Sequence, residues 1–354
     1  MANKTILQLI KHPFLEILEF SRFRAKCGSH PLLDIRSPAE YANGHIPGAI
    51  SFPLFSNEER AQVGTLYKSK GKREAVKTGL EIVGPKMVEF VNRAEALGTD
   101  LLTMYCWRGG MRSASMGWLL ENAGFKISVL EGGYKTYRRT LHQYFEQPLN
   151  LRVISGYTGS RKTDFLKMLG EHGAQVIDLE KLAQHQGSSF GNQKSVSQPS
   201  TEQFQNLTFD AFLALDKDRI IWIEDECLRI GQVTMIEALH RQKESSPHIF
   251  IEIPKSQRVA YLVGDYGSIG KPKLIEATKG IQRKLGGVRT KRAIEFILKG
   301  QLKEAVNIIL EYYDKQYQGA SSRKQDQIVG HYQINMAELQ DLAKELIEEE
   351  NHVI

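Results

Sequence analysis

Short apolar runs alternate with amphipathic, helix-prone stretches along most of this chain, which is the pattern of a parallel α/β sheet. In the first half, the run Leu101–Tyr105 predicts a buried strand, and a helix-like stretch follows the turn after it. In the second half, strands are predicted at residues 151–155, 174–179, 219–224 and 248–253, and helices at 164–169 and 201–215. Residues 274–317 are largely helical in pattern, and Asn335 with Glu338 is a capping box before a last helix.

A domain boundary is predicted near Gln147 and Pro148, where a segment rich in tyrosine, arginine and histidine ends. With 354 residues the chain is long enough for two domains. We assign residues 1–146 to the first domain and residues 147–354 to the second.

Two further segments have an unusual composition. A charged, helix-prone insertion lies between Pro53 and Leu101, and we expect the glycines at 64, 71, 79 and 84 to break its helices. The polar segment 184–201 is predicted to be a mobile loop.

The overall composition is that of an ordinary globular protein, with 41% hydrophobic and 25% charged residues. No apolar run approaches the ~20 residues that span a bilayer, and the amino terminus has no cleavable signal, so we expect a cytoplasmic protein without membrane contact. The three cysteines, Cys27, Cys106 and Cys227, form no CxxC pair, which argues against a disulfide framework or a thiolate zinc site.

Positive charge is concentrated in one stretch. Residues 271–299 hold nine lysines and arginines against two glutamates, a larger excess than the +6 of the whole chain. These charges flank the sequence LGGVR at 285–289, a flexible break where the backbone could approach a phosphate. A solvated helix face is the usual explanation of a charge run, but this excess favours contact with nucleic acid. The candidate binding residues are Arg283, Lys284, Arg289, Lys291 and Arg292.

The most informative motif is the stretch YCWRGGMRS at residues 105–113. It places Cys106 in a turn with two glycines and two arginines. A cysteine is a nucleophile only as thiolate, which nearby cations and a helix N-terminus favour. Glycine N–H groups and guanidinium groups can also hold an oxyanion such as phosphate. We therefore predict that Cys106 is catalytic, with a buried structural cysteine as the alternative. The predicted anion-binding residues are Arg108, Gly109, Gly110 and Arg112.

A second motif, GYTGSRKT at residues 156–163, lies between a predicted strand and a predicted helix. It matches the phosphate-binding pattern G-x-x-x-x-G-K-[ST], except that Arg161 replaces the second glycine. Arg161 adds a cation but is expected to crowd the place where backbone meets phosphate, so we predict phosphate or diphosphate binding rather than nucleotide hydrolysis. The predicted phosphate-binding residues are Gly156, Gly159, Ser160, Arg161, Lys162 and Thr163, of which Thr163 could ligate magnesium.

Three consecutive acids, Glu224, Asp225 and Glu226, follow the predicted strand RIIWI. A magnesium-binding carboxylate of a P-loop protein would lie at this position, so one of them could hold Mg²⁺ or exchange protons. A helix N-terminus decorated with acids is an equally good interpretation.

Two more motifs indicate which kind of domain contains the Cys106 loop. Residues 32–54 read LLDIRSPAEYANGHIPGAISFPL, and residues 129–139 read VLEGGYKTYRR. Together with the loop they resemble the rhodanese domain of sulfurtransferases, in which the loop cysteine carries a persulfide held by N–H groups of the loop. We interpret Asp34, Arg36, Glu40 and His45 as scaffold.

The pairing of such a domain with a P-loop resembles the bacterial tRNA 2-selenouridine synthase family. Further shared motifs are FSNEERAQVGTLYKSKG at 55–71, QGSSFG at 186–191 and KLGGVR at 284–289. The resemblance covers nearly the whole chain. It implies an α/β fold class, with an N-terminal rhodanese-like parallel-sheet domain followed by a P-loop α/β domain that has a helical C-terminal part.

The resemblance also implies a function. The family replaces sulfur by selenium in wobble 2-thiouridine of tRNAs for Lys, Glu and Gln, with selenophosphate as donor. It can attach a geranyl group from geranyl diphosphate to that sulfur, which becomes a leaving group. By this resemblance Cys106 is the essential cysteine, and Gly156, Gly159, Lys162 and Thr163 form the P-loop. Our own hypothesis is that the P-loop holds geranyl diphosphate and that the basic stretch contacts the tRNA. No tightly bound cofactor is expected, Mg²⁺ could participate, and an enzyme that supplies selenophosphate could be a partner.

Two other functions fit the motifs. One is a plain sulfurtransferase whose second domain binds nucleotide for regulation. The other is a non-catalytic tRNA-binding protein, to which the altered P-loop motif lends some weight.

Overall fold

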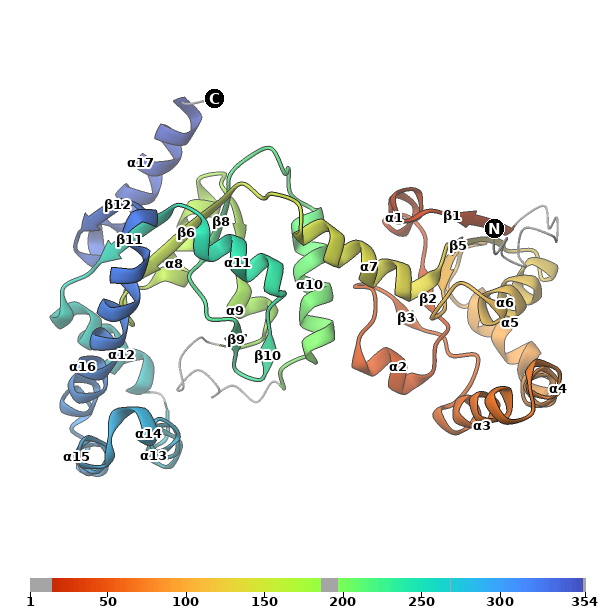
Figure 1. The fold of residues 1–354 in the computed structure, drawn as a ribbon, viewed down its shortest axis with the longest axis horizontal. Coiled ribbons are helices and arrows are strands. Elements are labelled where there is room, and N and C mark those ends of the chain that lie inside the picture. Colours follow the sequence, from red (N-terminus) through yellow and green to blue (C-terminus); the bar gives the residue numbers. More distant parts are fainter. Residues whose placement is uncertain (1–14, 186–196, 268, 353–354) are drawn as a thin grey trace. The chain divides into compact units, whose positions relative to one another are not determined.

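The chain folds as two units, Met1–Tyr144 and Phe145–Ile354, each with its own five-stranded sheet (Figure 1). The computed structural model describes residues 15–185, 197–267 and 269–352. The QGSSFG motif and most of the predicted loop 184–201 lie outside these ranges. Within them, no helix is both long and apolar enough to cross a membrane.

All neighbouring strands of the first sheet are parallel. Their order is β1 (Leu15–Leu18), β5 (Lys126–Leu130), β4 (Leu101–Tyr105), β2 (Leu32–Asp34) and β3 (Ile50–Ser51). The helices of this unit outside the insertion are α1 (Phe20–Cys27), α2 (Pro38–Asn43), α6 (Met111–Asn122) and α7 (Gly133–Phe145). Strand β4 begins and ends where the apolar run predicts. It is the central strand of the sheet, and its residues Leu102 and Met104 are buried in the hydrophobic core.

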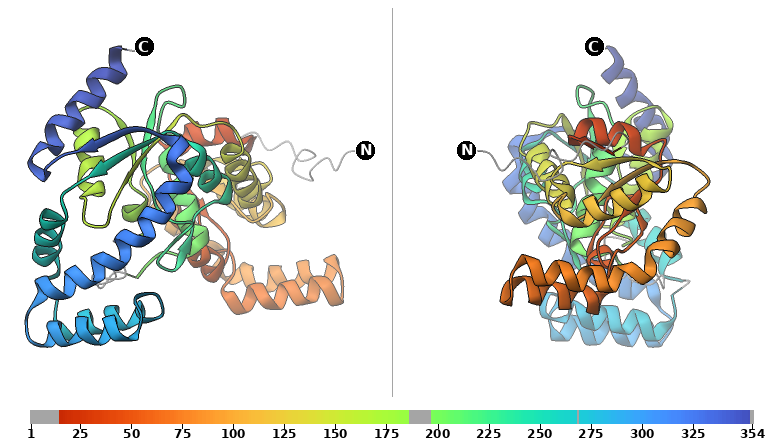
Figure 2. Two further views of the ribbon diagram at one scale, coloured as in Figure 1. Left: turned by 60° about the vertical axis from the view of Figure 1, so that its left-hand side comes forward. Right: turned by 90° about the vertical axis from the view of Figure 1, so that its right-hand side faces the viewer.

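The insertion is helical, and its first two helices pack as a hairpin (Figure 2). The helices of the insertion are α3 (Asn57–Ser69), α4 (Lys72–Val83), the short 3₁₀ helix η2 (Gly84–Lys86) and α5 (Met87–Glu95). Ser56 and Glu59 form a capping box at the start of α3. The chain reverses at Gly71, whose φ is +84°, and α4 ends at Gly84. The expected breaks at Gly64 and Gly79 were wrong, because a glycine with helical φ weakens a helix only slightly.

The second sheet is also parallel throughout. Its order is β12 (Ile328–Gln333), β11 (His248–Glu252), β6 (Leu151–Gly156), β8 (Ile221–Glu224) and β7 (Gln175–Ile177). Helices α8 (Lys162–Glu171) and α17 (Leu339–His352) share one hydrophobic core with this sheet, through Phe165 and Leu342 among others. The 3₁₀ helix η4 (Met336–Glu338) leads into α17, and its capping box of Asn335 and Glu338 is confirmed.

Four strands of this sheet match the predicted strands, with small differences at their ends. Strand β7 is shorter than residues 174–179, because the Asp178 side chain accepts the Lys181 N–H and starts α9 (Leu179–Leu182). Helix α10 (Thr201–Leu213) begins where the Ser200 hydroxyl accepts the Gln203 N–H. A small antiparallel pair, β9 (Arg229–Ile230) and β10 (Val233–Thr234), precedes α11 (Glu237–Ser245). Strand β12 was not predicted.

The later helices of this unit gather into a cluster with its own core (Figures 1 and 2). They are α12 (Lys255–Gly267), α13 (Lys271–Gly280), α14 (Gln282–Leu285), α15 (Gly287–Leu298) and α16 (Leu302–Ser321), followed by the 3₁₀ helix η3 (Ser322–Gln327). Leu262, Leu274, Ile297 and Leu310 are among its buried residues. We use the name helical cluster for α12–α16.

Candidate functional site

Cys106 follows directly on β4, and the loop after it leads into α6. Its side chain is only 3% exposed and belongs to the hydrophobic core of this unit, together with Met104 and Met116, whereas Trp107 and Arg108, which follow it in the chain, are exposed. The burial expected of a structural cysteine is therefore present, and the catalytic role of Cys106 stays a prediction that requires the loop to give a reactant access to the sulfur.

The second rhodanese-like motif holds this loop in place. Glycine is required at position 133, since a Cβ there would lie 2.2 Å from the Cys106 carbonyl oxygen and 2.6 Å from the Gly109 nitrogen. The N–H of Tyr134 donates to the Cys106 carbonyl at 2.8 Å, and that of Lys135 donates to the Trp107 carbonyl at 3.0 Å. The start of α7 is thus bound to the loop backbone.

The loop presents groups that can receive an anion. Across the described ranges, the N–H groups of Trp107–Gly110 donate to no backbone carbonyl, and Gly109 has a φ of +60°. Arg108 is exposed. Arg112 is engaged elsewhere, because its Nη1 atom lies 2.8 Å from Glu40 Oε2. Its predicted role in anion binding stays a prediction.

Glu40 is held ionised by its surroundings. Burial favours the neutral carboxyl, but the hydrogen bond and charge of Arg112, with the Ser37 N–H and Arg60, lower the pKa of Glu40 to about 2. Arg36 and Asp34 form a second, fully buried pair at 2.6 Å, and Arg36 also donates to the Gly44 carbonyl. These contacts agree with the interpretation of the acids and Arg36 as scaffold.

The P-loop connects β6 to α8 in the second unit. A Cβ at Gly156 would lie 2.5 Å from the Ile251 carbonyl oxygen, which explains this glycine. Arg161 adopts the left-handed conformation, with φ of 59° and ψ of 35°, in which a glycine would cost nothing. Its Nε donates to Asp164 Oδ2 at 2.8 Å, and its guanidinium lies 5.4 Å from the Tyr261 ring centroid. These contacts fix the arginine on the side of α8 and α12.

The polar side chains of the loop converge at the start of α8. Lys162 Nζ donates to the Gly156 carbonyl at 3.2 Å. The Thr163 hydroxyl lies 3.2 Å from Glu180 Oε2 and 3.2 Å from Glu224 Oε2. The hydroxyl of Ser160 is fully buried and has no hydrogen-bond partner among the described residues.

Three carboxylates form a cluster beside Thr163. One oxygen each of Glu180, Glu224 and Glu226 lies within 4.8 Å of the others, and Glu224 is 1% exposed with Oε1 lacking any described partner. Burial, and then the charge of Glu180, raises the pKa of Glu224 well above its usual range and that of Glu226 to about 7, although Lys162 opposes both shifts. Such a cluster fits a divalent cation, which would replace the protons.

Asp225 is separated from this cluster. Its Oδ1 atom lies 2.6 Å from Lys243 Nζ, and its Oδ2 atom accepts from the Ser155 hydroxyl at 3.2 Å. Lys243 and His248 are buried, and Ser155 Oγ lies 2.6 Å from His248 Nδ1. Of the three predicted acids, Glu224 contacts Thr163 and Glu226 joins the same carboxylate cluster, whereas Asp225 contacts β6 through Ser155 and α11 through Lys243.

Two family models match this chain. The tRNA 2-selenouridine synthase AAA domain matches residues 149–349, and the rhodanese-like domain matches residues 19–140. The tRNA 2-selenouridine synthase of Bdellovibrio bacteriovorus is 36% identical to it, over 83% of this chain and 89% of that protein. The one of Sulfurovum sp. is 33% identical, over 93% of this chain and 99% of that protein. The chain belongs to the tRNA 2-selenouridine synthase family. The family resemblance of the motifs and the predicted fold class are confirmed.

In this synthase-family chain, the basic stretch occupies the outside of the helical cluster. The predicted binding residues Arg283, Lys284, Arg289, Lys291 and Arg292 are all exposed, and no acid of the described chain forms an ion pair with them. The expected break is a single point, Gly286 with φ of +89°, between α14 and α15.

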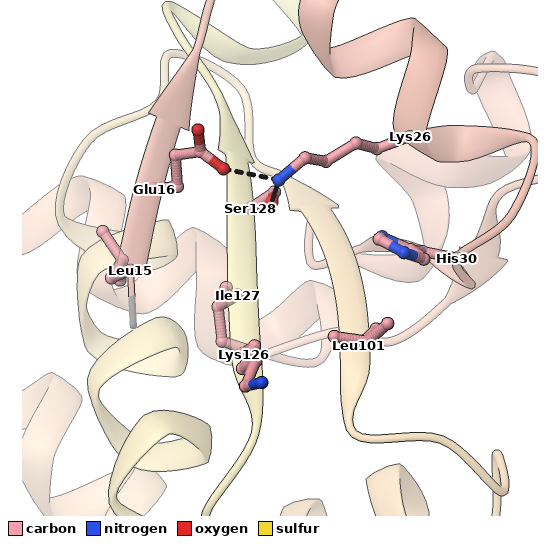
Figure 3. Close-up of a pocket in the computed structure, with 8 residues that line it drawn as sticks. All are labelled: Leu15, Glu16, Lys26, His30, Leu101, Lys126, Ile127 and Ser128. Carbon is pink, nitrogen blue, oxygen red and sulfur yellow. Dashed lines mark hydrogen bonds and ion pairs between the residues drawn. The ribbon is translucent and has the colours of Figure 1, made fainter. Parts of the chain in front are cut away.

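The rhodanese-like unit also has a cavity of about 410 Å³, which lies at the amino ends of β1, β4 and β5 (Figure 3). Lys26 Nζ lies in it, 2.5 Å from Glu16 Oε2 and 3.1 Å from Ser128 Oγ. Because Cys106 follows the carboxyl end of β4, this cavity is at the opposite edge of the sheet from the cysteine.

Sequence reasoning missed Glu180. It lies on α9, immediately after β7, and the carboxyl ends of parallel strands meet at one edge of a sheet. The acids that follow β7 were therefore a usable signal, because β8 ends in Glu224 at the same edge.

Proposed function

We propose that this protein replaces sulfur by selenium in the wobble 2-thiouridine of tRNA, with selenophosphate as donor and an S-geranylated nucleoside as intermediate. The observation that supports this most directly is the combination of a diphosphate-type P-loop and a cysteine loop in one chain of this family. Each unit then serves one of two chemical steps.

The first step is alkylation of the thiocarbonyl sulfur. The sulfur attacks C1 of geranyl diphosphate, the carbon–oxygen bond breaks, and diphosphate leaves. Lys162 and the loop amides would bind the diphosphate, and the buried hydroxyl of Ser160 offers a further donor. Tyr157 of the loop is half-buried, with its ring edge-on to Phe250 at 5.4 Å and the Arg258 guanidinium 5.0 Å from the ring centroid, and its open part would contact the isoprenoid.

A divalent cation fits beside this loop. Glu180, Glu224 and Glu226 would hold it together with the Thr163 hydroxyl, since Glu224 Oε1 has no partner in the described chain. A magnesium ion bound there would stabilise the charge of the departing diphosphate. Asp225 pairs with Lys243. The cation would therefore be bound by three carboxylates and not by four.

The second step is substitution at C2 of the alkylated base. The selenium of selenophosphate attacks this carbon, the carbon–sulfur bond breaks, and geranylthiol leaves. Water then attacks phosphorus, the selenium–phosphorus bond breaks, and phosphate is released. Arg108 and the open N–H groups of Trp107–Gly110 would bind the phosphoryl oxygens near Cys106. The Arg112–Glu40 pair would position the first turn of α6.

The exposed cations of α14 and α15 would bind the tRNA backbone, because RNA affinity arises largely from phosphate contacts. Stacked or paired bases hide their ring carbons, so a single-stranded anticodon loop suits this chemistry.

Separate assays of the two steps test the proposal. tRNA bearing 2-thiouridine is incubated with geranyl diphosphate, and geranylated tRNA with selenophosphate, and nucleosides are identified by mass spectrometry. Lys162→Ala should lose the first reaction and keep the second. Cys106→Ala should lose the second, and Cys227→Ser, which changes an exposed cysteine, should keep both. If Cys106→Ala retained both reactions, the assignment of the steps would be wrong.

A further inference from the structure

The insertion of the rhodanese-like unit ends in a charged tip. Helices α3 and α4 lie side by side (Figure 2), and the chain turns between them at Lys70 and Gly71. From Arg60 to Arg73 the sequence contains no acid. We use the name hairpin tip for residues 67–73.

Cations at the base of the hairpin are paired, whereas those at the tip are not. At the base, Lys86 lies 2.5 Å from Glu59, and Arg60 lies 3.3 Å from Glu40. At the tip, four exposed cations form no ion pair with any described acid: Lys68, Lys70, Lys72 and Arg73. Helix stability does not require this arrangement, since like charges so close in sequence repel one another.

An aromatic side chain lies among these cations. Tyr67 is 52% exposed, although a tyrosine can bury most of its ring when a core is available. Cations that follow a backbone, together with an exposed aromatic ring, are the features that bind single-stranded nucleic acid. An acidic protein surface would also complement these cations, but an exposed aromatic ring among them favours unpaired bases, on which it can stack.

We propose that the hairpin tip is a second RNA-binding surface, in which Lys68, Lys70, Lys72 and Arg73 contact tRNA phosphates and Tyr67 stacks on an unpaired base. It gives the rhodanese-like unit its own hold on the substrate, in addition to the cations of α14 and α15. The inference rests on the proposed function, because it requires tRNA as the substrate.

The test compares two triple variants of the full chain with the same change in net charge. The tip variant is Lys68→Gln/Lys70→Gln/Lys72→Gln. The control is Lys126→Gln/Lys217→Gln/Lys344→Gln, at exposed lysines outside the tip. Dissociation constants for 2-thiouridine tRNA are measured at several salt concentrations. The tip variant should bind about ten-fold or more weakly near 150 mM salt, and its log–log salt slope should be smaller by about 2. The control should match the wild type in both.

Stacking is tested separately at Tyr67. Tyr67→Leu should weaken binding about five-fold or more with an unchanged salt slope, and Tyr67→Phe should restore it. Irradiation of the complex should cross-link RNA to the peptide that contains residues 67–73. All altered side chains are exposed, and circular dichroism verifies that the helices form.

The outcomes separate the two proposals. Tip and control variants that bind tRNA alike, with equal salt slopes, would overturn the RNA-binding tip and leave the proposed function standing. Equal tRNA binding together with loss of binding to an acidic partner protein would assign the tip to protein recognition and equally overturn it. A wild-type protein that binds no tRNA would remove both proposals.

Discussion

The hydroxyl of Thr163 lies 3.2 Å from Oε2 of Glu224. This contact joins the first turn of α8 to the end of β8, so the phosphate-binding loop and the carboxylate cluster form one site. A hydroxyl and a carboxylate so placed can share a cation with a bound diphosphate. The prediction about cation binding depends on this relationship.

Cation binding should depend on Glu224. We expect Glu224→Gln to weaken Mg²⁺ binding at least ten-fold, because one charged ligand is lost from a small cluster. Titration calorimetry at pH 8 measures the affinity. The matched control is Glu171→Gln, an exposed acid at the far end of α8, which should bind Mg²⁺ as the wild type does. Equal affinity in all three proteins would refute the cation site.

The pH dependence of stability should reflect Glu226. Burial and the charge of Glu180 raise the pKa of Glu226 to about 7, so the folded protein binds more protons than the unfolded chain between pH ~4.5 and 7. The free energy of unfolding should therefore fall as pH rises through this range, by on the order of 3 kcal/mol from this group. Above pH 7 the contribution of Glu226 should level off, and any further fall would come from Glu224, whose pKa is also raised.

Urea unfolding without added metal, monitored by hydrogen exchange of the β8 amides, measures how the free energy of unfolding depends on pH. Glu226→Gln should reduce the slope between pH 5 and 7, and Mg²⁺ should restore stability at pH 8 by stabilising the ionised carboxylates. A stability that rises with pH over this range would contradict the assignment.

The left-handed backbone at Arg161 should decide which residues the P-loop accepts there. Arg161→Gly and Arg161→Asn should keep diphosphate affinity within a few-fold, because both residues tolerate positive φ. Arg161→Val should lower the free energy of unfolding by about 1–2 kcal/mol and weaken diphosphate binding. Calorimetric titration with inorganic diphosphate distinguishes them, and a valine variant that binds normally would show that the loop conformation is unimportant.

Close packing at Gly133 should matter more than its φ alone. Both Gly133 and Gly98 have positive φ, at +62° and +72°, but only a Cβ at Gly133 would collide with the Cys106 loop. Gly98→Ala should cost about 1 kcal/mol in unfolding free energy. Gly133→Ala should cost several times more and change the rate at which iodoacetamide alkylates Cys106. Similar losses in both variants would show that the contact with the loop is not decisive.

Much of the fold could be predicted because its central strands are continuous apolar runs that end in distinctive loops. Strands β4 and β6 begin where the runs begin, since central parallel strands are buried on both faces. Strand β12 could not be found in this way. It lies at the edge of its sheet, alternates between half-buried and exposed residues, and contains Gly330.

The site could be predicted only as far as local motifs reach. The loops around Cys106 and Lys162 are contiguous in sequence, so their residue types were readable. Glu180 joins the cluster through the sheet, from a four-residue helix with no motif of its own. The roles of the three consecutive acids also could not be distinguished from the sequence. In the structure Asp225 pairs with Lys243, whereas Glu224 contacts Thr163.

We propose that this protein converts 2-thiouridine into 2-selenouridine in tRNA. The most direct test of this proposal is the nucleoside composition of bulk tRNA from cells that lack the gene, compared with the same cells expressing the wild type or Cys106→Ala. We expect 2-selenouridine to disappear without the gene, to return with the wild type and to stay absent with Cys106→Ala. An unchanged 2-selenouridine content in cells without the gene would contradict the account.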